Sequence, residues 1–168
     1  MQRSRYTVLV VLSFLLLAVV GCGPLNFGIN SRAVTITIDL DEGMLNRLLS
    51  EAQNKVVAVN GEALLAEISQ IDFQAPDTIR VFGSRNQNGS TIEGNFDVQT
   101  LLDQGALKVN ISAVNIPGYS LDSPAIQQIN NELSKAFTEQ INQQQEGAIS
   151  SVQVTEDALS LVIEVPFR

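Results

Sequence analysis

The stretch Ser123–Ile141, SPAIQQINNELSKAFTEQI, carries the clearest pattern in this chain of 168 residues. Its apolar residues recur at intervals of three or four, which is the spacing of one face of an α-helix. Ser123 is a typical helix N-cap, and Pro124 suits the first helical position because an amide is not needed there. The pattern predicts a long amphipathic helix that ends near Gly147. Its apolar stripe is Ile126, Ile129, Leu133, Phe137 and Ile141.

Alternating apolar and polar residues on both sides of this helix predict β-strands joined by short turns. The predicted strands are, in chain order, 78–83, 92–100, 107–111 and a closing hairpin over 149–165. The apolar residues change parity at Val114 and Ile116, which predicts a β-bulge or a stretch buried on both faces. Strands connected by short turns are antiparallel, so this half of the chain predicts an antiparallel sheet.

The segment before these strands predicts a strand over 34–40 and a shorter helix from Asp41 to Ala52. Asp39 and Asp41 together could form a cation site, but helix capping by an aspartate side chain explains them more simply. Residues 54–75 are harder to interpret. They predict a short strand at Val56–Val59 and a further strand over 65–73.

The order of these elements predicts the fold class α+β, because the helices do not alternate regularly with the strands. The expected architecture is one curled antiparallel sheet wrapped around one long amphipathic helix, with the shorter helix near the N-terminus. Residues 33–168 are expected to form a single domain of this kind. A domain of that length can bury enough apolar surface to fold without disulfides.

The first 21 residues have the pattern of a secretory signal peptide. Basic Arg3 and Arg5 precede an apolar run from Val8 to Val20, which is too short to span a bilayer comfortably. The sequence Val-Val-Gly-Cys at 19–22 resembles the bacterial lipobox, and its cysteine is the only one in the chain. An uncleaved membrane anchor with an incidental cysteine is the alternative interpretation. Residues 22–32 are expected to be a lipidated tether.

The lipobox resemblance implies a diacylglyceryl group on the Cys22 thiol and, in many such proteins, a further acyl chain on its amine. Two or more chains hold a protein stably at a membrane, whereas one chain binds only marginally. The implied location is the extracytoplasmic side of a bacterial cell envelope. Gly23 stands where some lipoproteins carry an inner-membrane retention aspartate, which favours the outer membrane if the organism has one.

Composition argues against most enzymes and against nucleic-acid binding. The chain has 10 basic and 18 acidic residues, and without Arg3 and Arg5 the remaining 8 basic residues leave a net charge of −10. Such a chain lacks the positive charge that binds phosphate backbones. It has no His, so the commonest general base and the commonest metal ligand are missing. It also has no Trp. A pair of carboxylates could still serve a glycosidase, but we expect no catalysis, no metal and no cofactor.

The order of elements and their apolar pattern resemble the small lipoproteins related to tubular lipid-binding (TULIP-like) proteins, including the LmeA-type phospholipid-binding group. The likeness covers residues 33–168, from the strand and helix at Thr35–Ala52 to the closing LSLVIEVPF at 159–167. In that family a long antiparallel sheet curls around a long helix, and acyl chains enter the space between them. The resemblance therefore implies a lipid-binding groove.

Two hypotheses about function follow. In the first, the protein is a membrane-anchored lipoprotein that binds or carries lipids or similar hydrophobic ligands, such as a phospholipid or a fatty-acyl compound. Its groove would be lined by the helix stripe and by Phe96 and Val98. In the second, the same side chains fill an ordinary core, and the protein is an anchored scaffold that recognises another envelope protein.

Overall fold

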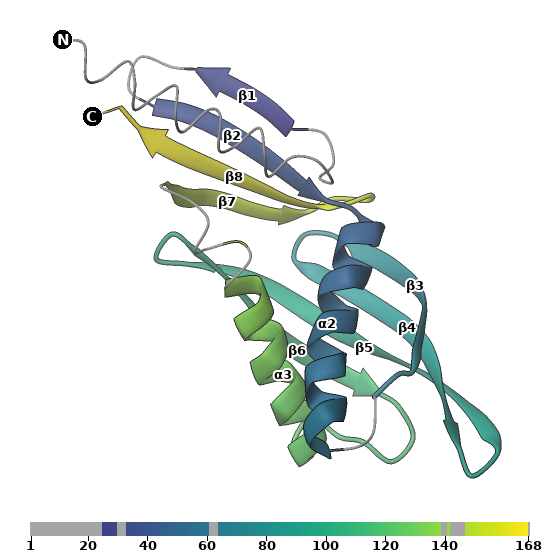
Figure 1. Cartoon of the computed structure of the whole chain (residues 1–168). Coiled ribbons are helices and arrows are strands. Elements are labelled where there is room, and N and C mark those ends of the chain that lie inside the picture. Colours follow the sequence, from purple (N-terminus) through teal and green to yellow (C-terminus); the bar gives the residue numbers. More distant parts are fainter. Residues whose placement is uncertain (1–24, 30–32, 61–63, 139–140, 142–146, 168) are drawn as a thin grey trace.

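The computed structural model describes residues 25–29, 33–60, 64–138, 141 and 147–167, and these form an α+β structure (Figure 1). In this part of the chain the strands form two antiparallel four-stranded sheets. The terminal sheet has the order β1 (Leu25–Ile29), β2 (Ala33–Leu40), β8 (Leu159–Pro166), β7 (Ala148–Val154). The middle sheet consists of β3 (Glu67–Gln74), β4 (Thr78–Gln87), β5 (Ser90–Asp103) and β6 (Ala106–Asn115) in chain order. The predicted α+β class is confirmed, but two sheets replace the single sheet that we expected.

Two helices, α2 (Glu42–Asn60) and α3 (Pro124–Phe137), lie side by side against one face of the middle sheet (Figure 1). They pack against each other, and α3 also packs against β6. One continuous apolar cluster runs through both helices and both sheets. The terminal sheet is joined to the middle sheet through β7, which packs against β5 and β6.

Helix α2 begins with a capping interaction. The backbone amide of Met44 donates to Oδ1 of Asp41 at 2.9 Å, and the amide of Leu45 donates to the Asp41 carbonyl at 3.0 Å. A side-chain oxygen at this position satisfies an amide that has no partner within the helix. The capping interpretation of Asp41 is therefore confirmed.

Helix α2 is longer than we predicted, with 19 residues against the 14 described for α3. It continues to Asn60, so the short strand predicted at Val56–Val59 is wrong. Valine favours strands only weakly, and packing of a helix against a neighbour readily overrides that preference. Here the neighbour is α3, which the α2 sequence alone does not show.

The segment that we expected to be a tether contains a strand. Residues Leu25–Ile29 form β1 and pair with β2, from Leu25 opposite Ile38 to Ile29 opposite Val34. Because β2 would otherwise expose one edge of the terminal sheet, β1 gives its backbone groups hydrogen-bond partners. The part of the predicted tether that the structure describes, Leu25–Ile29, is therefore a strand of the terminal sheet.

The turns and the bulge of the middle sheet follow the sequence prediction. Asn88 and Gly89 both have positive φ and join Gln87 to Ser90, as expected of a two-residue Asn-Gly hairpin. Between β5 and β6, Asp97 lies opposite Ala113 but Val98 lies opposite Ile111. Ser112 is thus an extra residue, and the bulge predicted from the change of parity is confirmed.

Helix α3 begins where the sequence predicts, with Ser123 before it and Pro124 in its first turn. The Ser123 side chain does not cap the helix, because its hydroxyl donates to the Ser120 carbonyl at 2.7 Å. Residues 139–140 and 142–146, where the helix is predicted to end, lie outside the described residues.

Two glycines lie where neighbouring atoms come close to the backbone of the middle sheet. Gly83 in β4 lies opposite Gly94 in β5. A Cβ on Gly83 would lie 2.2 Å from the Glu67 carbonyl oxygen, and one on Gly94 would lie 2.7 Å from Cγ1 of Ile116. No side chain fits in these places without movement of the neighbouring backbone or core.

We therefore predict that Gly83→Ala and Gly94→Ala each lower the free energy of unfolding by about 1–3 kcal/mol, as overpacking does. Chemical denaturation of each variant measures the loss. Gly43→Ala is the control, because its nearest neighbour, Oδ1 of Asp41, is 3.5 Å away and alanine is favoured in helices. Equal stability of all three variants would contradict this account of the glycine pair.

Candidate functional site

The structure brings the seven predicted groove residues together in one apolar cluster. Four of them lie on α3, Ile141 follows that helix, and the other two lie on β5. Their exposed fractions are Ile126 1%, Ile129 2%, Leu133 0%, Phe137 2%, Ile141 7%, Phe96 1% and Val98 3%. The convergence of the helix stripe with β5 is what the groove hypothesis requires. That these residues contact a ligand stays a prediction.

The apolar layer that contains these residues has a second wall, which the sequence prediction did not include. Helix α2 contributes Leu45, Leu48, Leu49 and Ala52 to the same cluster, each with an exposed fraction of 6% or less. Their helical spacing was visible in the sequence, but nothing there showed that the two helices meet. We call the space between the two helices and the middle sheet the interlayer.

One polar contact fixes α3 to the middle sheet. The amide of Ile111 donates to Oδ1 of Asn130 at 2.7 Å. Ile111 precedes the bulged Ser112, and a bulge disrupts the regular ladder of hydrogen bonds locally. Asn130 supplies an acceptor there. The sequence prediction missed this role of Asn130.

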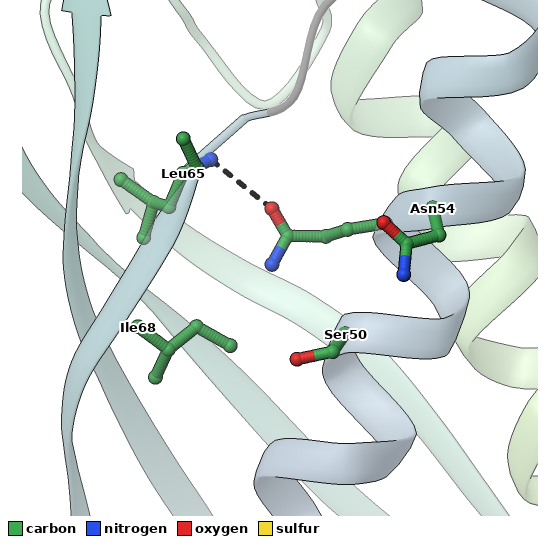
Figure 2. Close-up of a pocket in the computed structure, with 6 residues that line it drawn as sticks. Ser50, Asn54, Leu65 and Ile68 are labelled. Atoms are coloured by element: carbon green, nitrogen blue, oxygen red, sulfur yellow. Dashed lines mark hydrogen bonds between the residues drawn. The ribbon is translucent and has the colours of Figure 1, made fainter.

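A pocket of about 230 Å³ lies between α2 and the segment that leads into β3 (Figure 2). The α2 side is polar and consists of Ser50, Gln53 and Asn54. Gln53 is buried, and its Oε1 accepts a hydrogen bond from the Leu65 amide at 3.1 Å. Since polar groups line this pocket and it is open to solvent, it does not resemble an acyl-chain site.

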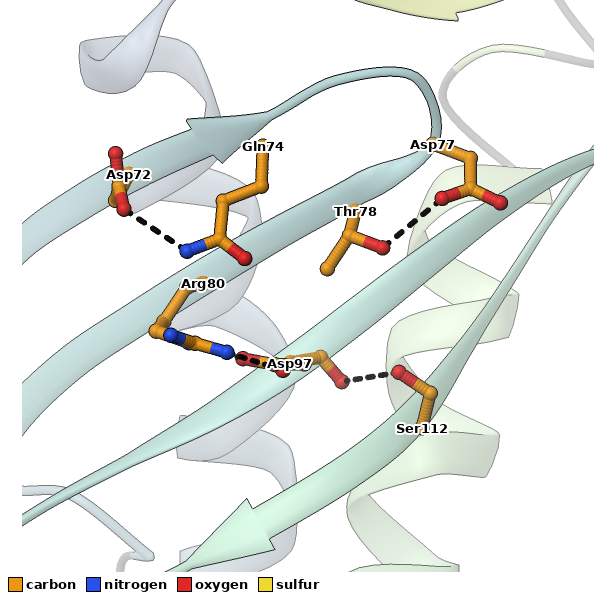
Figure 3. Close-up of polar contacts among 7 residues, drawn as sticks. All are labelled: Asp72, Gln74, Asp77, Thr78, Arg80, Asp97 and Ser112. Atoms are coloured by element: carbon orange, nitrogen blue, oxygen red, sulfur yellow. Dashed lines mark hydrogen bonds and ion pairs between the residues drawn. The ribbon is translucent and has the colours of Figure 1, made fainter.

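The face of the middle sheet opposite the helices carries polar contacts (Figure 3). Arg80 on β4 forms a two-pronged ion pair with Asp97 on β5, with N–O distances of 2.7 and 2.9 Å. The hydrogen bond to Asp97, followed by the charge of that carboxylate, raises the pKa of Arg80. These contacts are typical of a solvated sheet face, where such pairs contribute little to stability.

Arg85 lies on the other face of the same strand and is buried, with 8% of its surface exposed. Along β4 the buried residues alternate as Ile79, Val81, Gly83 and Arg85, so Arg85 shares the helix-facing side with two core residues. The sequence prediction missed Arg85. The signal was present, because Arg85 continues the alternation of the apolar residues and Arg80 does not.

The hydrogen-bond acceptors described for Arg85 are all neutral. Its Nη1 donates to the Tyr119 hydroxyl at 2.6 Å, and its Nη2 donates to Oε1 of Gln87 at 3.2 Å and to the Pro117 carbonyl at 3.3 Å. The Tyr119 ring lies 4.6 Å from the guanidinium carbon. Within the described structure the Nε of Arg85 is buried without a hydrogen-bond partner.

The described residues contain no group of three or more Cys, Asp or Glu side chains that could hold a metal ion. No helix in the described part of the chain is both long enough and apolar enough to cross a membrane. Cys22 and the signal-peptide residues lie outside the described residues.

Comparison with protein-family models, with curated proteins and with solved structures finds no match to this chain.

Proposed function

We propose that this protein is a lipid-anchored component of a bacterial cell envelope that binds an acyl ligand, such as a phospholipid, in the interlayer. The observation that carries the proposal is the convergence of the α3 stripe with Phe96 and Val98 on one face of the middle sheet. Aliphatic and aromatic side chains without polar groups are suited to acyl chains. A membrane anchor would place such a carrier next to its ligand.

The proposal includes curling of the middle sheet around α3, as in the TULIP-like proteins that the sequence resembles. Two irregularities in the sheet support this part. One is the bulge at Ser112, and the other is a shift of register between Ile68 and Gln70 in β3. Bulges bend a strand and increase its twist, so a sheet with two of them curves readily.

The position of β1 constrains the proposed anchor. β1 begins at Leu25, which is three residues after Cys22. Three extended residues span about 10 Å. A lipid on Cys22 would therefore hold the terminal sheet close to the membrane surface, much closer than a tether that reached residue 32 would.

A second candidate function is an anchored scaffold that recognises another envelope protein. Its support is the tight burial of the interlayer, where Leu133 has no exposed surface and Ile126 has 1%. Side chains buried to this degree are the normal content of a filled core. In that case the ligand would be a protein, and the interlayer would have only a structural role.

Replacing Leu133 by tryptophan separates the two candidates. In a filled core Leu133→Trp should lower the free energy of unfolding by about 1–3 kcal/mol. In a ligand-binding interlayer the added ring would take the place of the acyl chain. We therefore predict weaker binding of a fluorescent fatty-acyl probe by this variant, with only a small change in melting temperature. Phe137→Leu, which removes a ring, should alter the amount of bound probe in the same assay.

Leu121→Trp is the matched control, because Leu121 is 38% exposed and lies outside the interlayer. This variant should bind the probe as the parent does. Should the parent bind no probe while Leu133→Trp melts far earlier, the carrier proposal fails and the scaffold proposal stands.

A further inference from the structure

Arg85 and Arg80 are five residues apart on β4, but their environments are opposite. Arg80 lies on the outer face and is paired with a carboxylate. Arg85 lies on the interlayer side, and all three of its hydrogen-bond acceptors are neutral oxygens. A buried charge without a counter-ion is unfavourable unless something compensates it. In a chain with 18 acidic residues, a carboxylate partner would have been easy to supply.

The guanidinium of Arg85 has N–H donors left that could bind a ligand. An arginine side chain has five N–H donors, and the described contacts use three of them. Nε is buried without an acceptor. The remaining donors are the Nε–H and one N–H of Nη1, and a guanidinium N–H binds a carboxylate or phosphate oxygen more strongly than a neutral oxygen.

Arg85 lies at one end of β4, on the side that faces the interlayer. Gly83 precedes Arg85 on the helix-facing side of β4, and Gly94 lies opposite Gly83. Ile116, which is 3% exposed and belongs to the apolar cluster, lies over Gly94. The helix-facing side of β4 therefore changes from apolar residues to one cation at the end that carries Arg85.

A surface loop separates Arg85 from solvent. The loop runs from Ile116 to Tyr119, and its Pro117 and Gly118 are exposed. A Cβ at Gly118 would have no atom within 4 Å, so it would point into open space. Pro117 and Tyr119 of this loop accept hydrogen bonds from Arg85, so an anionic group that reaches the guanidinium has to displace them.

We propose that Arg85 binds the anionic group, a carboxylate or a phosphate, of the ligand whose apolar part occupies the interlayer. This inference rests on the proposed function, and it adds that the ligand is an amphipathic anion. A lipid headgroup and a free phosphate share the chemistry that Arg85 recognises. The experiment therefore needs to distinguish these sources.

The test compares two fluorescent probes with the same acyl chain, one ending in a carboxylate and the other in an alcohol. It uses the full chain with Cys22→Ala, so that no covalent lipid competes. The parent should bind the carboxylate probe about tenfold more tightly, because a charge-assisted pair is stronger than a neutral one. Arg85→Met should reduce this ratio to about one while binding of the alcohol probe is retained.

Two control variants separate binding from general effects. Arg80→Met removes the same charge from the outer face and should keep the tenfold preference. Tyr119→Phe removes one acceptor of Arg85 but leaves the cation, so it should also keep the preference. A purely structural role of Arg85 would lower the melting temperature of Tyr119→Phe and Arg85→Met and leave the preference of both unchanged.

The outcomes distinguish this inference from the proposed function. If Arg85→Met keeps the tenfold preference, the anionic group binds elsewhere and the inference is wrong, although the interlayer still binds acyl chains. If neither probe binds, the proposed function fails. Inorganic phosphate then decides the inference: an increase in melting temperature that Arg85→Met abolishes identifies a free-anion site, and no increase rejects Arg85 as an anion site.

Discussion

Deletion of residues 148–168 is expected to abolish the cooperative unfolding transition of this protein. The deletion removes β7 and β8, and β8 lies between β2 and β7 in the terminal sheet. It removes five side chains with exposed fractions of 3% or less: Ile149, Val154, Leu159, Leu161 and Ile163. Burial of each is worth about 1.5–3 kcal/mol, and the sum is comparable to the whole stability of a typical domain.

The deletion also separates the two sheets. The Val154 amide donates to the Pro76 carbonyl at 2.8 Å, and the Ile149 amide donates to the Gly105 carbonyl at 3.0 Å. These bonds join both ends of β7 to turns of the middle sheet. Thermal unfolding followed by circular dichroism measures the effect. A sharp transition in the shortened chain would show that the hairpin is peripheral.

A point substitution in β8 tests the contribution of this hairpin with a smaller change. Leu161→Ala should cost about 2–5 kcal/mol of stability, because Leu161 has no exposed surface. Val162→Ala is the matched control on the other face of β8, where the side chain is only half-buried. Equal losses in the two variants would contradict the orientation of β8.

Substitution of Cys22 by alanine is expected to release the protein from membranes completely. The thiol is the proposed acceptor of the lipid, and the net negative charge of the chain opposes contact with an anionic membrane surface. Separation of membrane and soluble fractions after a salt wash measures the release.

Gly23→Ala leaves the thiol in place and should remain in the membrane fraction. The released Cys22→Ala protein should unfold cooperatively, because the substitution leaves the described core from Ala33 to Ile163 unchanged. If Cys22→Ala sediments with membranes as the parent does, the lipoprotein interpretation is wrong.

The elements with a regular local period were predictable from the sequence. The α3 stripe, the alternation along β5 and the closing hairpin each repeat at the spacing of their secondary structure, so a short window is enough to identify them. The bulge at Ser112 was predictable for the same reason, because one extra residue reverses the parity of every later side chain.

The division into two sheets was not predictable in this way. It depends on the pairing of β2 with β8, in which Ala33 lies opposite Pro166 at the other end of the chain. No local pattern specifies such a pairing. The length of α2 also depends on a distant element, because its contact with α3 joins residues far apart in the sequence.

The candidate site was predicted in part. The seven apolar residues were identified from periodicity, and the structure brings them together. Arg85 was missed, because the predicted strand ended at Gly83 and a charged residue beyond it is normally assigned to the solvated surface. Its position in phase with Ile79 and Val81 was the available evidence, and it outweighs residue type once β4 is known to face the helices on that side.

The central claim is that the interlayer carries an acyl ligand, and mass spectrometry of material that co-purifies with the full chain carrying Cys22→Ala tests it most directly. Denaturing extraction should release about one non-covalent acyl lipid per chain, with an anionic headgroup. The same preparation of Leu133→Trp should release much less. A parent protein that is folded, has the mass of the bare polypeptide under native conditions and releases no lipid would contradict the account.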